Sequence, residues 1–125
     1  MKSIIAIIIL VCFAGCKKDS VMKRDKELPV IKLFSPVDGN MYTPGQIIKI
    51  GGYIRDNNFI AEVHIVMTNN NTGAEFLHAH MYAQGDSTVF DHDIAAISGI
   101  NYKVAITAVD RNLNQAYSQV IFSCP

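Results

Sequence analysis

The sequence lacks the motifs of the common enzyme classes. It contains no Gly-x-Ser-x-Gly, no glycine-rich phosphate loop and no His-Glu-x-x-His. It also lacks the apolar periodicity of an amphipathic helix, and it has no internal repeat. No acid, base and nucleophile occur together at a useful spacing. We therefore expect a protein that is not an enzyme.

Cysteine is scarce, and neither sign of charge dominates. There are three cysteines in the chain, and eleven basic residues balance eleven acidic ones. From Pro29 onward the sequence has five basic and eight acidic residues, which gives this part a net charge of −3. Nucleic-acid phosphates require a basic surface, which this charge balance does not provide. We expect no nucleic-acid partner.

The N-terminus has the pattern of a secretory signal peptide. A basic start, Met1-Lys2, precedes an apolar run from Ile4 to Ala14. A membrane-spanning helix needs about 20 apolar residues, so this run is too short to be one. Residues Phe13-Ala14-Gly15-Cys16 resemble a bacterial lipobox. The resemblance implies that residues 1–15 are removed and that Cys16 is lipidated; the alternative is ordinary secretion with a buried Cys16.

A charged segment separates Cys16 from the folded part of the chain. Residues 16–28 carry Cys16 and then polar and charged residues without apolar periodicity, which predicts a flexible tether. The opening Cys-Lys-Lys-Asp partly resembles the charged signals of surface-exported lipoproteins of Bacteroidota. Lipidation of Cys16 and loss of Cys12 would leave Cys124 as the one free thiol. The folded domain is expected to span residues 29–125.

The folded domain is expected to be all-β. Short segments with alternating apolar and polar residues are separated by clusters of turn residues, which is typical of strands. The seven expected segments are residues 30–34, 46–55, 60–68, 74–83, 88–94, 99–110 and 115–122. Within the second, Gly51-Gly52 indicates a bulge or a close backbone approach. Seven short strands without a helix predict a β-sandwich.

Both ends of this domain resemble bacterial immunoglobulin-like domains. Many of these begin with a pattern like that of Pro29 to Gly39, with Pro-x-Ile followed by Ser-Pro-x-x-Gly. The pattern Gly-x-x-Tyr-x-Val-x-Ile-x-Ala-x-Asp-x-x-x-Asn, from Gly99 to Asn114, resembles the last two strands of immunoglobulin-like and fibronectin-III-like domains. The resemblance implies a tyrosine corner, in which Tyr102 is buried and its hydroxyl bonds to backbone near residues 96–99.

Together with the lipobox, the domain resembles small lipoproteins of Bacteroidota whose function is unknown. The resemblance implies a seven-stranded immunoglobulin-like β-sandwich behind a signal peptide and a tether. It also implies a location, in which Cys16 anchors the protein in the bacterial envelope, at the outer membrane on its periplasmic or surface face. We expect a binding, adhesion or assembly module without catalytic activity. Its partners would be the membrane, through the lipid, and an unidentified protein or glycan.

Three of the four histidines are expected on one outer face of the sheet. Side chains alternate along a strand, so His78 and His80 share a face. If the apolar residues of the two neighbouring segments face the core together, the pairing places His64 opposite His78 and Glu62 opposite His80. Three imidazoles and a carboxylate would bind Zn²⁺ or Cu²⁺. In the alternative interpretation the histidines only cover the sheet. His92 is expected on the core-facing side.

A cluster of oxygen donors is expected at one end of the domain. In this fold the turns after the second and sixth segments lie at the same end, so Asp56 should approach Asp110, Asn112 and Asn114. Carboxylate and amide oxygens are ligands for Ca²⁺. The alternative is that these side chains satisfy the backbone groups of their own turns.

Overall fold

The computed structural model describes residues 23–125, so the signal peptide, Cys16 and the first part of the tether lie outside the described residues. The strands are β1 (Val30–Ser35), β2 (Ile47–Asn69), β3 (Glu75–Ala95), β4 (Ile100–Asp110) and β5 (Gln115–Cys124). Within residues 23–125 there is no helix, and therefore none that is long and apolar enough to span a membrane. The expected all-β class is confirmed.

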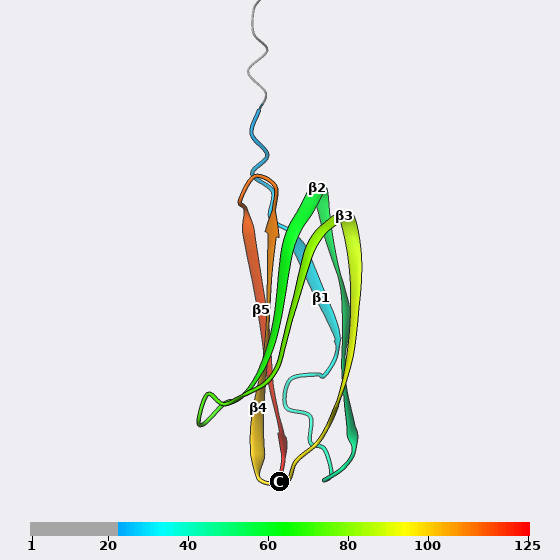
Figure 1. Ribbon diagram of the computed structural model, residues 1–125, viewed down its shortest axis with the longest axis vertical. Coiled ribbons are helices and arrows are strands. Elements are labelled where there is room, and N and C mark those ends of the chain that lie inside the picture. Colours follow the sequence, from blue (N-terminus) through cyan, green and yellow to red (C-terminus); the bar gives the residue numbers. More distant parts are fainter. Residues whose placement is uncertain (1–22) are drawn as a thin grey trace, which may run out of the picture.

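The five strands form one sheet that curls into two facing layers (Figure 1). The long strands β2 and β3 run antiparallel and pair along nearly their whole length. The first half of β2 also pairs with β1, whereas its second half pairs with β4, which pairs in turn with β5. Because β2 and β3 contribute to both layers, they bend together at one end of the domain, at the top of Figure 1.

The expected number of strands is wrong, because seven sequence segments form five strands. The second and third segments are the two halves of β2, and the fourth and fifth are the two halves of β3. At Asp56, where a turn was expected, β2 bends without ending, and its register with β3 shifts between Arg55 and Ile60. Opposite this bend, Gly85 of β3 has a φ of 80° and pairs with Ile60. Irregular pairing of this kind lets paired strands bend sharply.

The core lies between the two layers and follows from the alternation of the strands. In β4 every second residue is buried, which is the period-2 pattern of a strand with one face in the core. The largest fully buried apolar side chains are Tyr102, Phe122, Ile48, Ile50, Ile54, Ile60, Ile65, Met67, Ile106, Val63 and Val104. Each such side chain contributes about 1.5–3 kcal/mol when it leaves water. The core therefore holds the bent β2–β3 pair against β4.

Two local expectations are confirmed. The fully buried Tyr102 accepts a 2.8 Å hydrogen bond at its hydroxyl oxygen from the amide nitrogen of Ile97, which forms the tyrosine corner. Gly52 lies where β1 and β2 approach closely: a Cβ atom there would overlap the Lys32 carbonyl oxygen and would lie 2.6 Å from Phe90 Cζ. The register between β1 and β2 is irregular beside this glycine.

Candidate functional site

Two histidines and a glutamate from neighbouring strands meet on the outer face of the β2–β3 pair. Glu62 and His64 are two residues apart on β2, and His80 lies on β3 directly opposite His64. Alternation places all three on the side opposite to the buried Val63 and Ile65. Glu62, His64 and His80 are termed the histidine site below.

One carboxylate oxygen joins the three side chains of the histidine site. Glu62 Oε1 lies 2.8 Å from His64 Nε2 and 2.5 Å from His80 Nε2. The two imidazole centroids are 3.8 Å apart, and the rings are tilted by 32°. The exposed fractions of the side chains are 35% for Glu62, 33% for His64 and 29% for His80, so a solvated ion can reach all three.

The histidines also keep the carboxylate of the site in its charged form. The hydrogen bond from His64, followed by that from His80, holds the pKa of Glu62 below its ordinary value of 4.5. On the far side of His80, the Tyr82 hydroxyl lies 2.9 Å from His80 Nδ1. A phenolic hydroxyl can donate or accept a hydrogen bond, so it holds His80 in place in either tautomer. His80 Nε2 thus stays turned toward Glu62.

His78 shares this face but lies outside the histidine site. The expected register is wrong by two residues, since His78 lies opposite Val66 and Glu62 lies opposite Tyr82. The His78 ring centroid is 5.8 Å from that of His64, and His78 Nδ1 lies 3.5 Å from Glu75 Oε2. Of the three expected histidine ligands, the structure therefore brings together two.

The register differs from expectation because of the hairpin between β2 and β3. The Asn69 amide donates to the Ala74 carbonyl, and the pairing then shifts where Met67 and Thr68 of β2 face Leu77 and Glu75 of β3. The extra residue, Phe76, packs its ring 5.3 Å from that of Tyr102. A bulge thus turns Phe76 toward the core, although simple alternation would place it outside.

His92 belongs to the other half of β3. It lies opposite the buried Ile50, as its expected core-facing position requires. Its Nε2 atom is buried and has no hydrogen-bond partner within residues 23–125. His92 therefore has no part in the histidine site.

A second cluster lies where the tether meets the domain. Asp25 comes from the tether, Asp56 from the bend of β2 and Asp110 from the last position of β4. One carboxylate oxygen from each lies within 4.8 Å of the other two. Asp25, Asp56 and Asp110 are termed the tether pole below. Sequence reasoning identified Asp56 and Asp110 but missed Asp25, because no apolar pattern marks a contact between the tether and the domain.

The aspartates of the tether pole fix their own turns. Asp110 is fully buried, and its Oδ1 accepts 2.8 Å hydrogen bonds from the amides of Asn112 and Asn114. Asp56 Oδ2 accepts hydrogen bonds of 2.9 and 3.0 Å from the amides of Asn58 and Phe59. The sequence offered the alternative that these side chains satisfy backbone groups. Asp110 Oδ1 and Asp56 Oδ2 do so.

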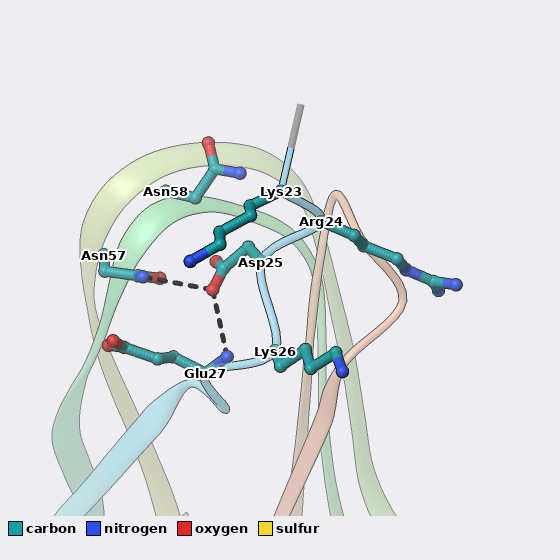
Figure 2. A pocket seen from close by; sticks show the side chains of 7 residues that line it. All are labelled: Lys23, Arg24, Asp25, Lys26, Glu27, Asn57 and Asn58. Carbon is teal, nitrogen blue, oxygen red and sulfur yellow. Dashed lines mark hydrogen bonds between the residues drawn. The ribbon is translucent and has the colours of Figure 1, made fainter. Parts of the chain in front are cut away.

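Asp25 attaches the tether to the domain. Its Oδ1 accepts hydrogen bonds from the Glu27 amide at 2.9 Å and from Asn57 Nδ2 at 3.2 Å, as Figure 2 shows. The Glu27 bond, followed by that from Asn57, lowers the pKa of Asp25 below its ordinary value of 3.8. Asn114 Nδ2 donates both to the Asp25 carbonyl oxygen, at 3.1 Å, and to Asp110 Oδ2, at 2.6 Å. Asn114 thus offers the pole its amide nitrogen and not its oxygen.

Two oxygens of the tether pole have no partner. Asp25 Oδ2 and Asp56 Oδ1 are buried and accept no hydrogen bond from the described part of the chain. The ion pairs found between residues 23 and 125 include none of the three aspartates. Within the described residues, therefore, no basic side chain forms an ion pair with these carboxylates.

A cavity of about 830 Å³ lies beside the tether pole (Figure 2). It is lined by Lys23, Arg24, Asp25, Lys26, Glu27, Asn57 and Asn58. The tether residues that line it are held at the pole, since Arg24 Nη2 also donates a 2.6 Å hydrogen bond to the Asn112 carbonyl. This lining consists of charged and amide side chains and carries no catalytic set.

No known family model and no curated protein matches the chain, whereas several solved structures resemble it. It is similar to the fibronectin(III)-like modules of Clostridium thermocellum CbhA, with a TM-score of 0.52, 16% identity and coverage of 78% of this chain and 46% of that one. It therefore spans about half of that structure. It is also similar to a superoxide reductase (neelaredoxin) of Ignicoccus hospitalis, with a TM-score of 0.52, 7% identity and coverage of 86% and 87%.

A weaker likeness is to the CARDB domain of the PF1109 protein of Pyrococcus furiosus, a structure in complex with di-metal ions. Its TM-score is 0.45, with 11% identity and coverage of 78% of this chain and 93% of that one. At such identities a likeness concerns the fold alone. The fibronectin(III)-like match agrees with the sequence pattern of the last two strands, so the domain is an all-β immunoglobulin-like fold.

Proposed function

We propose that this protein is a non-catalytic binding module of the bacterial cell envelope, anchored by a lipid on Cys16 and braced by Ca²⁺ at the tether pole. The lipobox and the apolar run before it support the anchor and the location at the outer membrane. Immunoglobulin-like folds often serve in binding and adhesion, which supports a protein or glycan partner. Because such a fold hosts many functions, the function has to be argued from the side chains of the site.

The observation that carries the proposal is the pair of buried oxygens without partners at the tether pole, Asp25 Oδ2 and Asp56 Oδ1. Asp25, Asp56 and the fully buried Asp110 each place one carboxylate oxygen within 4.8 Å of the other two. Carboxylates this close destabilise one another unless protons or a cation offset their charge. A cation between them would ligate both unpartnered oxygens and remove the repulsion.

The donor atoms of the tether pole favour calcium among the common cations. All three aspartates offer oxygen, which hard cations prefer, and no imidazole or thiol belongs to this group. Ca²⁺ accepts about six to eight oxygen ligands in flexible geometry, with water completing the shell. Mg²⁺ demands a more regular arrangement, which donors from three separate segments supply poorly. Calcium would thus join the tether, the bend of β2 and the end of β4.

An ion bound at the tether pole would set the orientation of the domain relative to the membrane. Asp25 lies nine residues after the proposed lipid attachment at Cys16. With Asp25 held by the ion, the tether would be joined to the domain at Asp25. The domain would then present its faces at a limited height and orientation, which favours capture of a partner near the membrane surface.

Thermal denaturation of the full-length protein in detergent, in calcium and in chelator, tests the proposal. If the Ca²⁺ concentration is about 100 times Kd, binding stabilises the folded state by about 2.7 kcal/mol, and each kcal/mol raises Tm by about 4–8 °C in a domain of this size. Asp25→Asn and Asp56→Asn should lose most of this rise. The matched control is Asp86→Asn, an exposed aspartate of β3, which should keep it. An unchanged Tm in calcium for the wild type would overturn the proposal.

A further inference from the structure

The histidine site and the tether pole offer different donor atoms. The pole presents carboxylate oxygens alone, whereas the histidine site presents two imidazole nitrogens and one carboxylate oxygen. Imidazole nitrogen suits Zn²⁺ and Cu²⁺, while hard cations prefer oxygen. The donor set of the histidine site therefore suits a different ion, independent of calcium.

The three donor atoms already converge on one point. Glu62 Oε1 is 2.8 Å from His64 Nε2 and 2.5 Å from His80 Nε2. Around a tetrahedral Zn²⁺ with bonds of about 2.0–2.2 Å, neighbouring ligand atoms lie about 3.3 Å apart. Glu62 Oε1 thus has to move about 0.5 Å farther from His64 Nε2 and about 0.8 Å farther from His80 Nε2 to admit the ion. Small rotations of the Glu62 side chain can supply this movement, since about a third of it is exposed.

The contacts of Glu62 with His64 and His80 add little to the stability of the fold. Ion pairs and hydrogen bonds between exposed side chains typically contribute little to the stability of a folded protein. The cross-strand pair His64–His80 holds two imidazoles with centroids 3.8 Å apart, and the Nε2 atoms of both lie against the same Glu62 oxygen. A metal ion at this place would bind all three donor atoms at once.

Tyr82 supplies the support that a metal-bound histidine usually has. A ligating histidine normally donates its second ring N–H to a neighbouring oxygen, which fixes the ring and its tautomer. The Tyr82 hydroxyl lies 2.9 Å from His80 Nδ1 and is placed to accept that hydrogen bond when Nε2 binds the ion. Tyr82 is thus a positioning residue and not a ligand.

We infer that the histidine site binds one divalent transition-metal ion, Zn²⁺ or Cu²⁺, through His64 Nε2, His80 Nε2 and Glu62 Oε1. Three protein ligands leave at least one coordination position for water or for an exogenous ligand. His78 is excluded from this set, because the register places it beside Glu75. Cu²⁺ should bind more tightly than Zn²⁺, as the general order of divalent affinities requires.

Titration calorimetry with ZnCl₂ and with CuCl₂ tests the inference on the full-length protein in detergent. Accessible thiols are alkylated first, and excess Ca²⁺ is present so that the tether pole does not take up the added ion. We expect one site per chain with Kd below about 0.1 mM for Zn²⁺. His64→Ala and His80→Ala should each raise Kd at least about tenfold, and Tyr82→Phe should raise it severalfold.

Three matched variants distinguish metal binding at the histidine site from binding elsewhere on the domain. His78→Ala removes a histidine of the same face, His92→Ala removes one of the opposite face, and Asp56→Asn alters the tether pole. Each should leave Kd within about twofold of the wild type. Absence of binding, or an equal loss in His78→Ala and His80→Ala, would overturn the inference. Loss in Asp56→Asn would overturn it as well, because the transition metal would then lie at the tether pole.

A spectroscopic measurement on the wild type does not depend on the folding of any variant. The electron paramagnetic resonance spectrum of the Cu²⁺-loaded protein should show superhyperfine splitting from two imidazole nitrogens. A spectrum with oxygen ligands only would contradict the assignment. Because calcium is present throughout, failure of this inference would leave the calcium-dependent Tm rise at the tether pole unaffected, and the reverse also holds.

Discussion

The amide nitrogen of Ile97 donates a 2.8 Å hydrogen bond to the hydroxyl of the fully buried Tyr102. Tyr102→Phe keeps the ring in the core but removes this bond, which should cost about 1 kcal/mol. Tyr102→Ala also empties the space between the rings of Phe76 and Phe122, which should cost about 3–5 kcal/mol. Urea denaturation of the two variants measures the difference. Equal midpoints would show that the ring contributes no more than the hydroxyl.

Gly52 should tolerate no side chain, whereas its neighbour should. A Cβ atom at Gly52 would overlap the Lys32 carbonyl oxygen, so Gly52→Ala must displace β1 or the ring of Phe90, at a cost of about 3 kcal/mol. A Cβ atom at Gly51 would have its nearest neighbour 3.7 Å away, which is an ordinary contact. Gly51→Ala should change stability by less than about 0.5 kcal/mol. Similar urea midpoints for the two variants would argue against close approach of β1 and β2.

The sequence predicts those parts of the fold that depend on local pattern. Alternation identifies β4 and its buried face, and turn residues identify the hairpin to β5, where Leu113 has a φ of 66°. The tyrosine corner at Tyr102 is implied by the resemblance of that pattern to immunoglobulin-like domains. In each case the residues that decide the structure lie within one strand or one turn, so no knowledge of distant contacts is needed.

The parts that sequence reasoning missed depend on contacts between distant segments. The Phe76 ring packs beside Tyr102, and the one-residue bulge there, added to the one-residue offset that the hairpin pairing of Thr68 with Glu75 sets, brings His80 and not His78 opposite His64. The shift is by two residues, so the predicted faces are correct while the predicted partners are wrong. Asp25 was missed for a similar reason, since its contact with Asn57 crosses 32 residues of sequence.

Asp110 should stabilise the domain even when no calcium is bound, whereas Asp25 should contribute chiefly when calcium is bound. Its Oδ1 holds the amides of Asn112 and Asn114 within a fully buried turn, so Asp110→Asn weakens two hydrogen bonds to a charged acceptor. We expect a loss of about 2–3 kcal/mol in chelator, measured by urea denaturation. Asp25→Asn should lose stability chiefly in calcium. An equal loss for Asp25→Asn in chelator and in calcium would mean that Asp25 acts only through its hydrogen bonds.

Cys16 should be the membrane anchor. Cys16→Ser removes the thiol that would carry the lipid, and we expect the protein to leave the membrane fraction after cell lysis. Stable anchoring by lipid depends on acyl chains, each buried CH₂ contributing about 0.8 kcal/mol. Intact-mass measurement of the detergent-extracted wild type should show the added lipid and a chain that begins at Cys16. An unacylated mass for the membrane-bound wild type would contradict this prediction, and Cys124→Ser, a change at a buried cysteine, is the control.

Glu62 should make the stability of the metal-free protein depend on pH. Its pKa is lowered in the folded state from the ordinary value of 4.5, first by the hydrogen bond from His64 and then by that from His80. A carboxyl group with a lowered pKa stabilises the fold above its unfolded pKa, and this contribution is lost as the pH falls through the folded value. Glu62→Gln cannot titrate, so the wild type should exceed it in Tm near neutral pH, and the difference should shrink once the pH falls below 4.5. Thermal scans of both proteins in chelator, from about pH 7 to about pH 3, measure this difference. Asp86→Asn is the control for general acid effects, and a difference between wild type and Glu62→Gln that stays constant over the whole range would show that the two histidines do not hold the Glu62 carboxylate.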